Sequence, residues 1–266
     1  MLRVFRIIFR LSGFLVLTIT LGPIQFISLF VSRPIARWLP VYYFRALLVL
    51  LGVRVETAGD HASGGTLLVC NHISWLDILV LGSIRPVHYV AKKEVEGWPL
   101  FGQLAKLNRT LFIDRQRRHQ AAEHSNAISD RLQGGDCLVL FPEGTSSDGL
   151  RVLPFKSALF SAVMPEPGLT SFPIQPVSMV YGKMHGIVMG RRQRSEFGWY
   201  GDTELLPHLL RVAGSPPFTV QLYYHTVPVL DQIAHRKDLA KYCETLTRDG
   251  IQQLLRSGLA PQAETR

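Results

Sequence analysis

The apolar residues of this chain form one long uninterrupted stretch near the N-terminus and many short runs after residue 53. Leu11–Ser32 (LSGFLVLTITLGPIQFISLFVS) contains no charged residue. A helix of this length would extend about 33 Å, enough to cross a hydrocarbon core of about 30 Å. A second apolar stretch, Val41–Val53, follows directly and carries Arg45. We therefore expect residues 1–52 to form a membrane-associating helical region.

The charges around this region do not indicate a direction of insertion. Basic residues stand on both sides of the first stretch, namely Arg3, Arg6, Arg10, Arg33 and Arg37. The positive-inside rule therefore favours neither orientation. Pro23 should kink a helix at the middle of the stretch. Two helices that dip into one leaflet, with both ends cytoplasmic, fit these charges at least as well as a single span. A secretory signal peptide is disfavoured, because the apolar run is too long and no A-x-A site follows.

After residue 53, short β-like runs alternate with helical patterns. The CLVLF run (Cys137–Phe141) is continuously apolar, which is typical of a strand covered on both faces. The alternation predicts an α/β fold, with a largely parallel or mixed sheet in a single layered domain over residues 53–266. The expected strands are Val53–Glu56, Thr66–Cys70, Val87–Ala91, Thr110–Ile113, Cys137–Phe141, Phe172–Tyr181 and Phe218–Tyr224. The expected helices are Trp75–Gly82, His119–Leu132 and Asp238–Leu255.

Composition favours lipid over nucleic acid as the partner. The chain is 47% hydrophobic and only 18% charged, whereas soluble domains have about 25% charged residues. The net charge of +9 suits nucleic acid or an anionic lipid surface. No zinc-finger spacing or RNP-like aromatic motif is present, so we expect membrane lipid and no nucleic acid. Three isolated cysteines favour a reducing compartment over a disulfide framework.

The first candidate for catalysis is the run NHISWLD (residues 71–77), which follows the TLLVC strand. On a straight helix, His72 and Asp77 would point about 140° apart. They can meet if His72 lies in the turn and Asp77 in the first helical turn, with Ser74 as N-cap. His72 would then be a general base, and Asp77 would fix its tautomer and stabilise the imidazolium. The same run also fits a capping box beside an ordinary turn histidine.

Two further clusters follow expected strands. Arg115, in FIDR (residues 112–115), could fork onto a phosphate or carboxylate. FPEGTSSDG (residues 141–149) is a glycine-containing loop whose amides could hold an anion or oxyanion. Taken alone, residues 112–115 also fit a solvated basic face, and residues 141–149 also fit a simple turn.

In this order, the clusters resemble the motif blocks of the glycerolipid acyltransferase family, which includes bacterial 1-acyl-glycerol-3-phosphate acyltransferases. The family's His-x4-Asp matches His72 and Asp77, and its FIDR-like and FPEGT blocks match residues 112–115 and 141–145. A Pro-rich apolar block matches residues 172–177. The resemblance covers about residues 66–178.

The resemblance implies that His72 and Asp77 are catalytic. It also implies that Arg115 contacts an anion and that Glu143, Gly144 and Thr145 bind substrate. The implied donor is an acyl thioester, either of acyl carrier protein or of CoA. The implied acceptor is a lysolipid, and no cofactor is implied. The remaining histidines show no H-x3-H or HExxH spacing, so we expect no metal site.

The acceptor is less clear. Many phosphatidic-acid-forming members carry arginine after EGT, where this chain has Ser146. Residues 189–191, 199–202 and 206–209 resemble lyso-ornithine lipid O-acyltransferases, whose acceptor carries an amino-acid headgroup. We therefore expect acylation of lyso-ornithine lipid, in ornithine lipid synthesis. The alternatives are 1-acyl-glycerol-3-phosphate, alone or as a second acceptor, and an inactive acyltransferase-like membrane adaptor. The expected location is the bacterial inner membrane, with the catalytic domain facing the cytoplasm. A serine hydrolase is disfavoured because no G-x-S-x-G is present.

Overall fold

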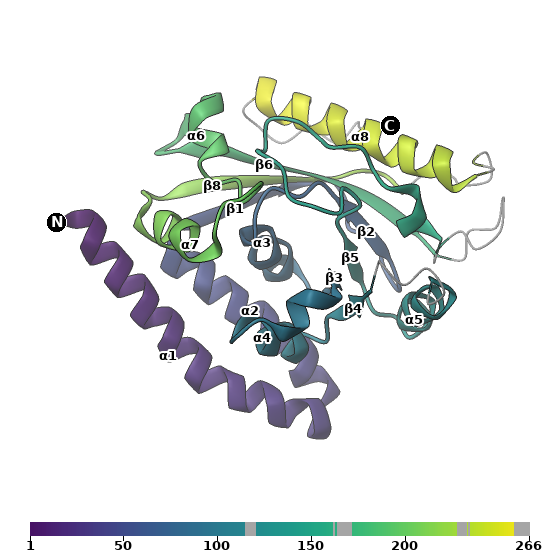
Figure 1. Cartoon of the computed structure of the whole chain (residues 1–266), viewed down its shortest axis with the longest axis horizontal. Helices are drawn as coiled ribbons and strands as arrows, with labels where there is room; N and C mark the ends of the chain where they lie inside the picture. The colour runs from purple at the N-terminus through teal and green to yellow at the C-terminus, as the bar shows by residue number, and fades with distance from the viewer. Residues whose placement is uncertain (115–120, 162, 164–171, 228–232, 234, 258–266) are drawn as a thin grey trace.

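The computed structural model describes residues 1–114, 121–161, 163, 172–227, 233 and 235–257. The chain begins with two long helices, α1 (Leu2–Val31) and α2 (Arg33–Leu51), which pack against each other (Figure 1). They are separated by Ser32, whose backbone is extended, and Pro34 lies in the first turn of α2. Gly52 ends α2 in the left-handed conformation, which glycine adopts without a Cβ clash.

The first helix is longer than the apolar stretch predicted. It begins at Leu2, so Arg3, Arg6 and Arg10 lie within the helix instead of before it. Arginine and leucine are good helix formers, and elongation of a nucleated helix is cooperative. By length and composition, both α1 and α2 could cross a membrane. Only 11% of the most apolar window of α1 is buried, which is unlike the core helix of a soluble protein.

Eight strands of the described chain form one mixed sheet, in the order β1-β8-β6-β2-β5-β3-β4, with β7 paired to β6. Neighbouring strands are parallel except at the two pairings β6–β8 and β6–β7. The predicted α/β class with a mixed sheet is thereby confirmed. The strands are β1 (Val53–Ala58), β2 (Leu67–Cys70), β3 (His88–Lys92), β4 (Leu111–Ile113), β5 (Leu138–Leu140), β6 (Ile174–Met184), β7 (Ile187–Val188) and β8 (Phe218–Tyr224).

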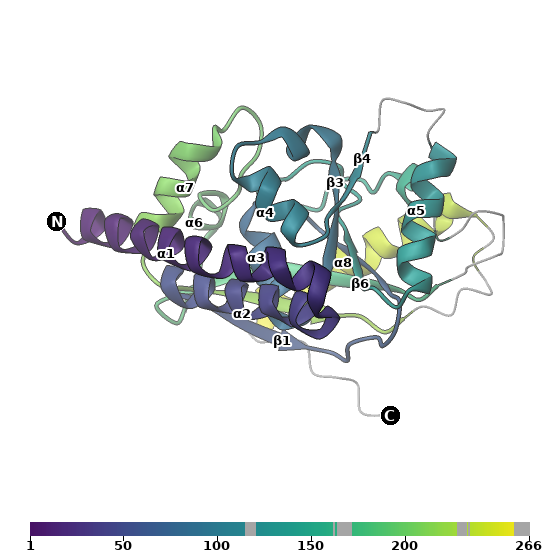
Figure 2. The ribbon, with the colours of Figure 1, turned by 90° about the horizontal axis from the view of Figure 1, so that it is seen from below.

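Helices cover both faces of this sheet (Figures 1 and 2). Helices α2, α3 and α7 pack on one face, with α1 and α4 beyond them, and α5 and α8 pack on the other. The helices after α2 are α3 (Leu76–Ile84), α4 (Phe101–Leu107), α5 (Ala121–Gln133), α6 (Arg191–Ser195), α7 (Leu205–Gly214) and α8 (Arg236–Ser257). Within the described residues, two 3₁₀ helices, η1 (Lys93–Gly97) and η3 (Ser157–Phe160), lie in connections.

Strand β2 shows how the sheet is buried. All four of its residues are buried, and their side chains alternate between the two faces. Leu68 and Cys70 belong to the cluster under α2, α3 and α7, whereas Leu67 and Val69 belong to the cluster under α5 and α8. Strand β2 is parallel to β5 in register, so the segments that follow the two strands emerge at the same edge. His72 follows β2 at that edge, and the FPEGT run begins directly after β5.

Candidate active site

The predicted meeting of His72 and Asp77 occurs in the structure. His72 lies in the turn after β2, Asp77 is the second residue of α3, and His72 Nδ1 lies 2.8 Å from Asp77 Oδ2. The expected cap by Ser74 is wrong: the N-cap is Trp75, and no side chain caps the helix. Instead, Asp77 Oδ2 accepts hydrogen bonds from the backbone N–H groups of Ile73 (2.6 Å) and Ser74 (2.9 Å). One carboxylate therefore closes the turn and orients the histidine.

The bonds around Asp77 decide which nitrogen of His72 carries the proton. Asp77 is fully buried, and its Oδ1 accepts from the Tyr181 hydroxyl at 2.7 Å. Burial, with the nearby charge of Asp77, raises the pKa of Tyr181 well above its ordinary value, so this hydroxyl remains a donor. Because an ionised carboxylate can only accept hydrogen bonds, His72 Nδ1 is the donor. Its Nε2 then keeps a lone pair, which is the state that a general base requires.

The ring and backbone of His72 are both held in place. The ring stacks on Phe141, with centroids 4.0 Å apart and planes at 17°. The His72 N–H donates to Glu143 Oε1 at 3.0 Å, and the His72 carbonyl accepts from the Ser147 N–H and hydroxyl at 2.8 and 3.1 Å. The loop over residues 141–149 therefore fixes the position of His72, and the side chain of His72 remains 18% exposed.

The residues predicted to bind substrate occupy different places. Gly144 and Thr145 line the cavity that His72 faces, and Gly144 adopts a φ of 73° that favours glycine. The Glu143 side chain turns into the protein, and burial raises its pKa to about 8. Its observed bond is to the backbone of His72, so direct contact with substrate stays a prediction. Arg115 lies outside the described residues, just beyond β4, and its contact with an anion also stays a prediction.

An apolar cavity of about 660 Å³ extends from His72 to the N-terminal helices. Its walls come from α1, α2, α3, α4 and α7, and sequence analysis did not anticipate that α1 and α2 would enclose it. Among the described lining residues, only Arg10 and Lys92 carry charge. Arg10 is engaged: its guanidinium donates to the carbonyls of Leu50 (3.0 Å), Ala213 (3.0 Å) and Ser215 (2.8 Å). A cavity with this lining suits a hydrocarbon chain.

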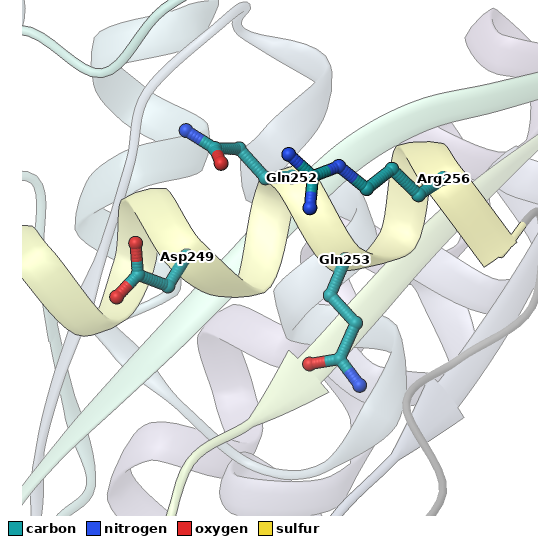
Figure 3. Close-up of a pocket in the computed structure, with 4 residues that line it drawn as sticks. All are labelled: Asp249, Gln252, Gln253 and Arg256. Atoms are coloured by element: carbon teal, nitrogen blue, oxygen red, sulfur yellow. The ribbon is translucent and has the colours of Figure 1, made fainter.

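A second hollow lies on α8 and offers no comparable chemistry. Figure 3 shows its four lining residues, which all come from this one helix: Asp249, Gln252, Gln253 and Arg256. Helix α8 covers the sheet face opposite α1 and α2 (Figure 1). Within the described residues, no group of three or more His, Cys, Asp or Glu side chains could hold a metal ion. The candidate site is therefore the cavity at His72.

The chain is similar to known acyltransferases over most of its length. Residues 52–180 match the family model described as Acyltransferase. The chain is 38% identical over 267 residues to the lyso-ornithine lipid O-acyltransferase of Brucella abortus, covering 99% of this chain and 100% of that protein. It is 37% identical to the protein of the same name from Rhizobium meliloti, over 90% and 83% of the two chains. A 1-acyl-sn-glycerol-3-phosphate acyltransferase of Neisseria meningitidis is 36% identical, over 45% of this chain and 48% of that one.

The fold is also shared with a solved structure. The crystal structure of the 1-acyl-sn-glycerophosphate (LPA) acyltransferase PlsC from Thermotoga maritima superposes with a TM-score of 0.66 at 22% identity. The match covers 96% of this chain and 98% of that one, so it includes most of the N-terminal helical region. Because a family model matches residues 52–180 and relatives that this chain covers over most of their length are 37–38% identical, the chain belongs to the acyltransferase family.

Proposed function

We propose that this acyltransferase moves a fatty acyl group from a thioester to the hydroxyl of lyso-ornithine lipid. The observation that carries the proposal is the His72–Asp77 pair on the wall of an apolar cavity, with Nε2 of His72 available as a base. Relatives named for lyso-ornithine lipid align over nearly the whole chain, whereas the Neisseria protein named for 1-acyl-sn-glycerol-3-phosphate aligns over less than half.

In the proposed reaction, His72 Nε2 removes the proton of the acceptor hydroxyl as its oxygen attacks the thioester carbonyl. Asp77 accepts from Nδ1 and stabilises the imidazolium that forms. The tetrahedral intermediate then collapses, the C–S bond breaks, and the thiolate leaves with the proton from Nε2. The products are the ester and a free thiol, with His72 restored. Thr145 lines the same cavity, and its backbone N–H would stabilise the oxyanion, whereas the Gly144 N–H already donates to the Phe141 carbonyl at 3.1 Å.

The second candidate acceptor is 1-acyl-sn-glycerol-3-phosphate. Two cations favour it: Lys92 lines the cavity, and Arg115 follows β4 in the sequence. The donor, whether acyl carrier protein or acyl-CoA, is part of the proposal as well. We further propose that residues 1–52 insert in one leaflet of the inner membrane, and that the domain over residues 53–266 faces the cytoplasm, where thioester donors are made.

The test is acyl transfer by the purified full-length enzyme with lyso-ornithine lipid and each donor in turn. A positioned general base contributes roughly 10²–10⁴-fold, so His72→Ala should lower kcat by that factor. Asp77→Asn should also lower kcat strongly, because the amide favours the wrong tautomer of His72. His235→Ala is the matched control, since this exposed histidine lies just before α8. Near-normal turnover by a folded His72→Ala enzyme would contradict the mechanism.

A further inference from the structure

The segment from Glu196 to Glu204 is attached to both catalytic blocks. The Trp199 N–H donates to the carbonyl of Ile73 at 2.8 Å, next to the catalytic base. The Trp199 carbonyl accepts from the hydroxyl of Ser146, next to the glycine loop. The Trp199 indole N–H donates to the Thr203 carbonyl at 2.7 Å, which closes the segment on itself. The segment therefore forms a wall of the active site, and the hydroxyl of Ser146 holds it in place.

Aromatic rings form the inner surface of this wall. Trp98, Trp199 and Tyr200 all line the cavity that contains His72. The rings of Trp98 and Trp199 meet edge to face, with centroids 5.8 Å apart at 78°. Both tryptophans are half-buried, and Tyr200 is exposed. Aromatic ring surface therefore extends from the cavity that contains His72 out to solvent at Tyr200.

The chemistry of this wall comes from its rings. Residues 196–204 (EFGWYGDTE) contain three carboxylates, but none of these lines the cavity, and three arginines directly precede the segment. The faces of indole and phenol rings bind ammonium groups through their negative quadrupole. Ring chemistry therefore favours a cationic group as the ligand of this wall.

We propose that Trp98, Trp199 and Tyr200 bind the primary ammonium of the acceptor headgroup and so select the acceptor, with Ser146 holding Trp199 in place. The proposal rests on the proposed function, because it deepens the recognition of lyso-ornithine lipid. Lys92 lines the same cavity and suits a carboxylate. A zwitterionic amino-acid headgroup can satisfy both: its ammonium meets the rings, and its carboxylate meets Lys92. Ser146 acts through Trp199 and is a positioning residue.

The experiment compares three acceptors with one donor and the full-length enzyme. The acceptors are lyso-ornithine lipid, its δ-N-acetyl derivative and its δ-N-trimethyl derivative. Acetylation removes the charge, whereas trimethylation keeps the charge and adds more bulk. We expect wild-type enzyme to prefer either charged acceptor over the acetylated one by roughly 5- to 30-fold in kcat/KM, with most of the difference in KM.

Variants of the wall should change this preference and little else. Trp98→Leu should reduce the preference for charge to less than about 3-fold, and Trp98→Phe should keep part of it. Trp38→Leu is the matched control, because Trp38 lies on α2 outside the cavity lining. Ser146→Ala should weaken the preference and Ser146→Thr should retain it. Ser195→Ala removes a comparable hydroxyl-to-carbonyl bond, at 2.8 Å to Arg192, and should change nothing.

The outcomes separate this inference from the function on which it rests. If wild-type enzyme acylates all three acceptors equally well, the aromatic wall does not bind the ammonium, and the proposed function stands. A charge preference that survives in Trp98→Leu and Ser146→Ala would likewise overturn the inference. If wild-type enzyme acylates 1-acyl-sn-glycerol-3-phosphate and none of the three, the proposed function fails and the inference fails with it.

Discussion

Helices α1 and α8 lie on opposite sides of the sheet and bury opposite kinds of side chain (Figure 1). Helix α8 buries mainly apolar residues, including Leu239, Cys243 and Leu254, and turns its charged residues outward except Glu244. Helix α1 buries Arg10, Gln25 and Ser28, and exposes a long row of large apolar side chains. That row consists of Leu2, Val4, Phe5, Ile8, Phe9, Leu15, Val16, Ile19, Ile24, Phe26, Ile27, Phe30 and Val31.

The difference indicates that the two faces of one sheet meet different surroundings. Helix α8 has the pattern of a helix that separates a core from water. Helix α1 is fixed to the protein by polar contacts: besides the bonds of Arg10, the Gln25 amide donates to the carbonyls of Ala36 and Leu107 at 3.0 Å each. An apolar outer row of this length would be unfavourable in water, and it is consistent with membrane association.

The largest effect should come from Arg10→Leu, which removes the charge that α1 buries. Three carbonyls would lose their donor, and each buried unsatisfied group costs about 1–3 kcal/mol. We expect the free energy of unfolding in detergent to fall by about 3–6 kcal/mol, although the substitution makes α1 more apolar. Arg6→Leu, one turn earlier, is the control and should cost less than about 1 kcal/mol. Equal effects of the two substitutions would show that α1 contributes apolar surface but no specific polar contact to stability.

An effect of intermediate size on the free energy of unfolding should come from truncating one side chain to alanine on each helix, and it should differ between α8 and α1. Leu254→Ala on α8 opens a cavity in the core and should cost about 3 kcal/mol in unfolding free energy. Ile19→Ala on α1 removes an outward side chain and should change the value by less than about 0.5 kcal/mol. Denaturant titration of both variants in one detergent measures the contrast. Similar losses would mean that the outer row of α1 packs against protein.

The smallest effect should appear in binding to lipid. Ile19→Asp places a charge in the outer row of α1 and should weaken partition into anionic vesicles by about 1–2 kcal/mol, because charged side chains are costly in an apolar medium. Gln252→Asp places the same charge on the exposed side of α8 and should leave partition unchanged. Vesicle flotation over a range of lipid concentrations measures both. If Gln252→Asp weakens partition as much as Ile19→Asp does, the change in net charge is the cause. The outer row of α1 would then have no special role in lipid binding.

Much of the fold could be predicted because burial on both faces leaves a clear signature in the sequence. Strand β8 was predicted with its observed bounds, and the other predicted strands lie within a few residues of the observed ones. Helices α4, α6 and α7 and the two-residue strand β7 were missed. Each is short, and Pro207 interrupts the helical pattern in α7. The apolar pattern misplaces the start of α1, because the uncharged stretch begins only after Arg10. In the structure, Arg10 lies within the helix and finds its partners inside the protein.

The candidate site was predictable only where its chemistry is local. His72 and Asp77 lie five positions apart, so their meeting followed from the turn between a strand and a helix. The meeting of Trp98 with Trp199 brings together residues from distant parts of the chain, and no local pattern reports it. Glu143 illustrates a subtler limit. Its motif was recognised, but only the fold shows that its carboxylate holds the backbone of His72.

The bonds of Arg10 also set an order of events during synthesis. Its acceptors Ala213 and Ser215 are made more than two hundred residues later. At a translation rate of about 5–20 residues per second, roughly 10–40 seconds separate the arginine from these partners. During that interval only the carbonyl of Leu50, made forty residues after Arg10, is available to the guanidinium. We therefore expect α1 to reach its final position only when the segment around Ala213 and Ser215 has closed around Arg10.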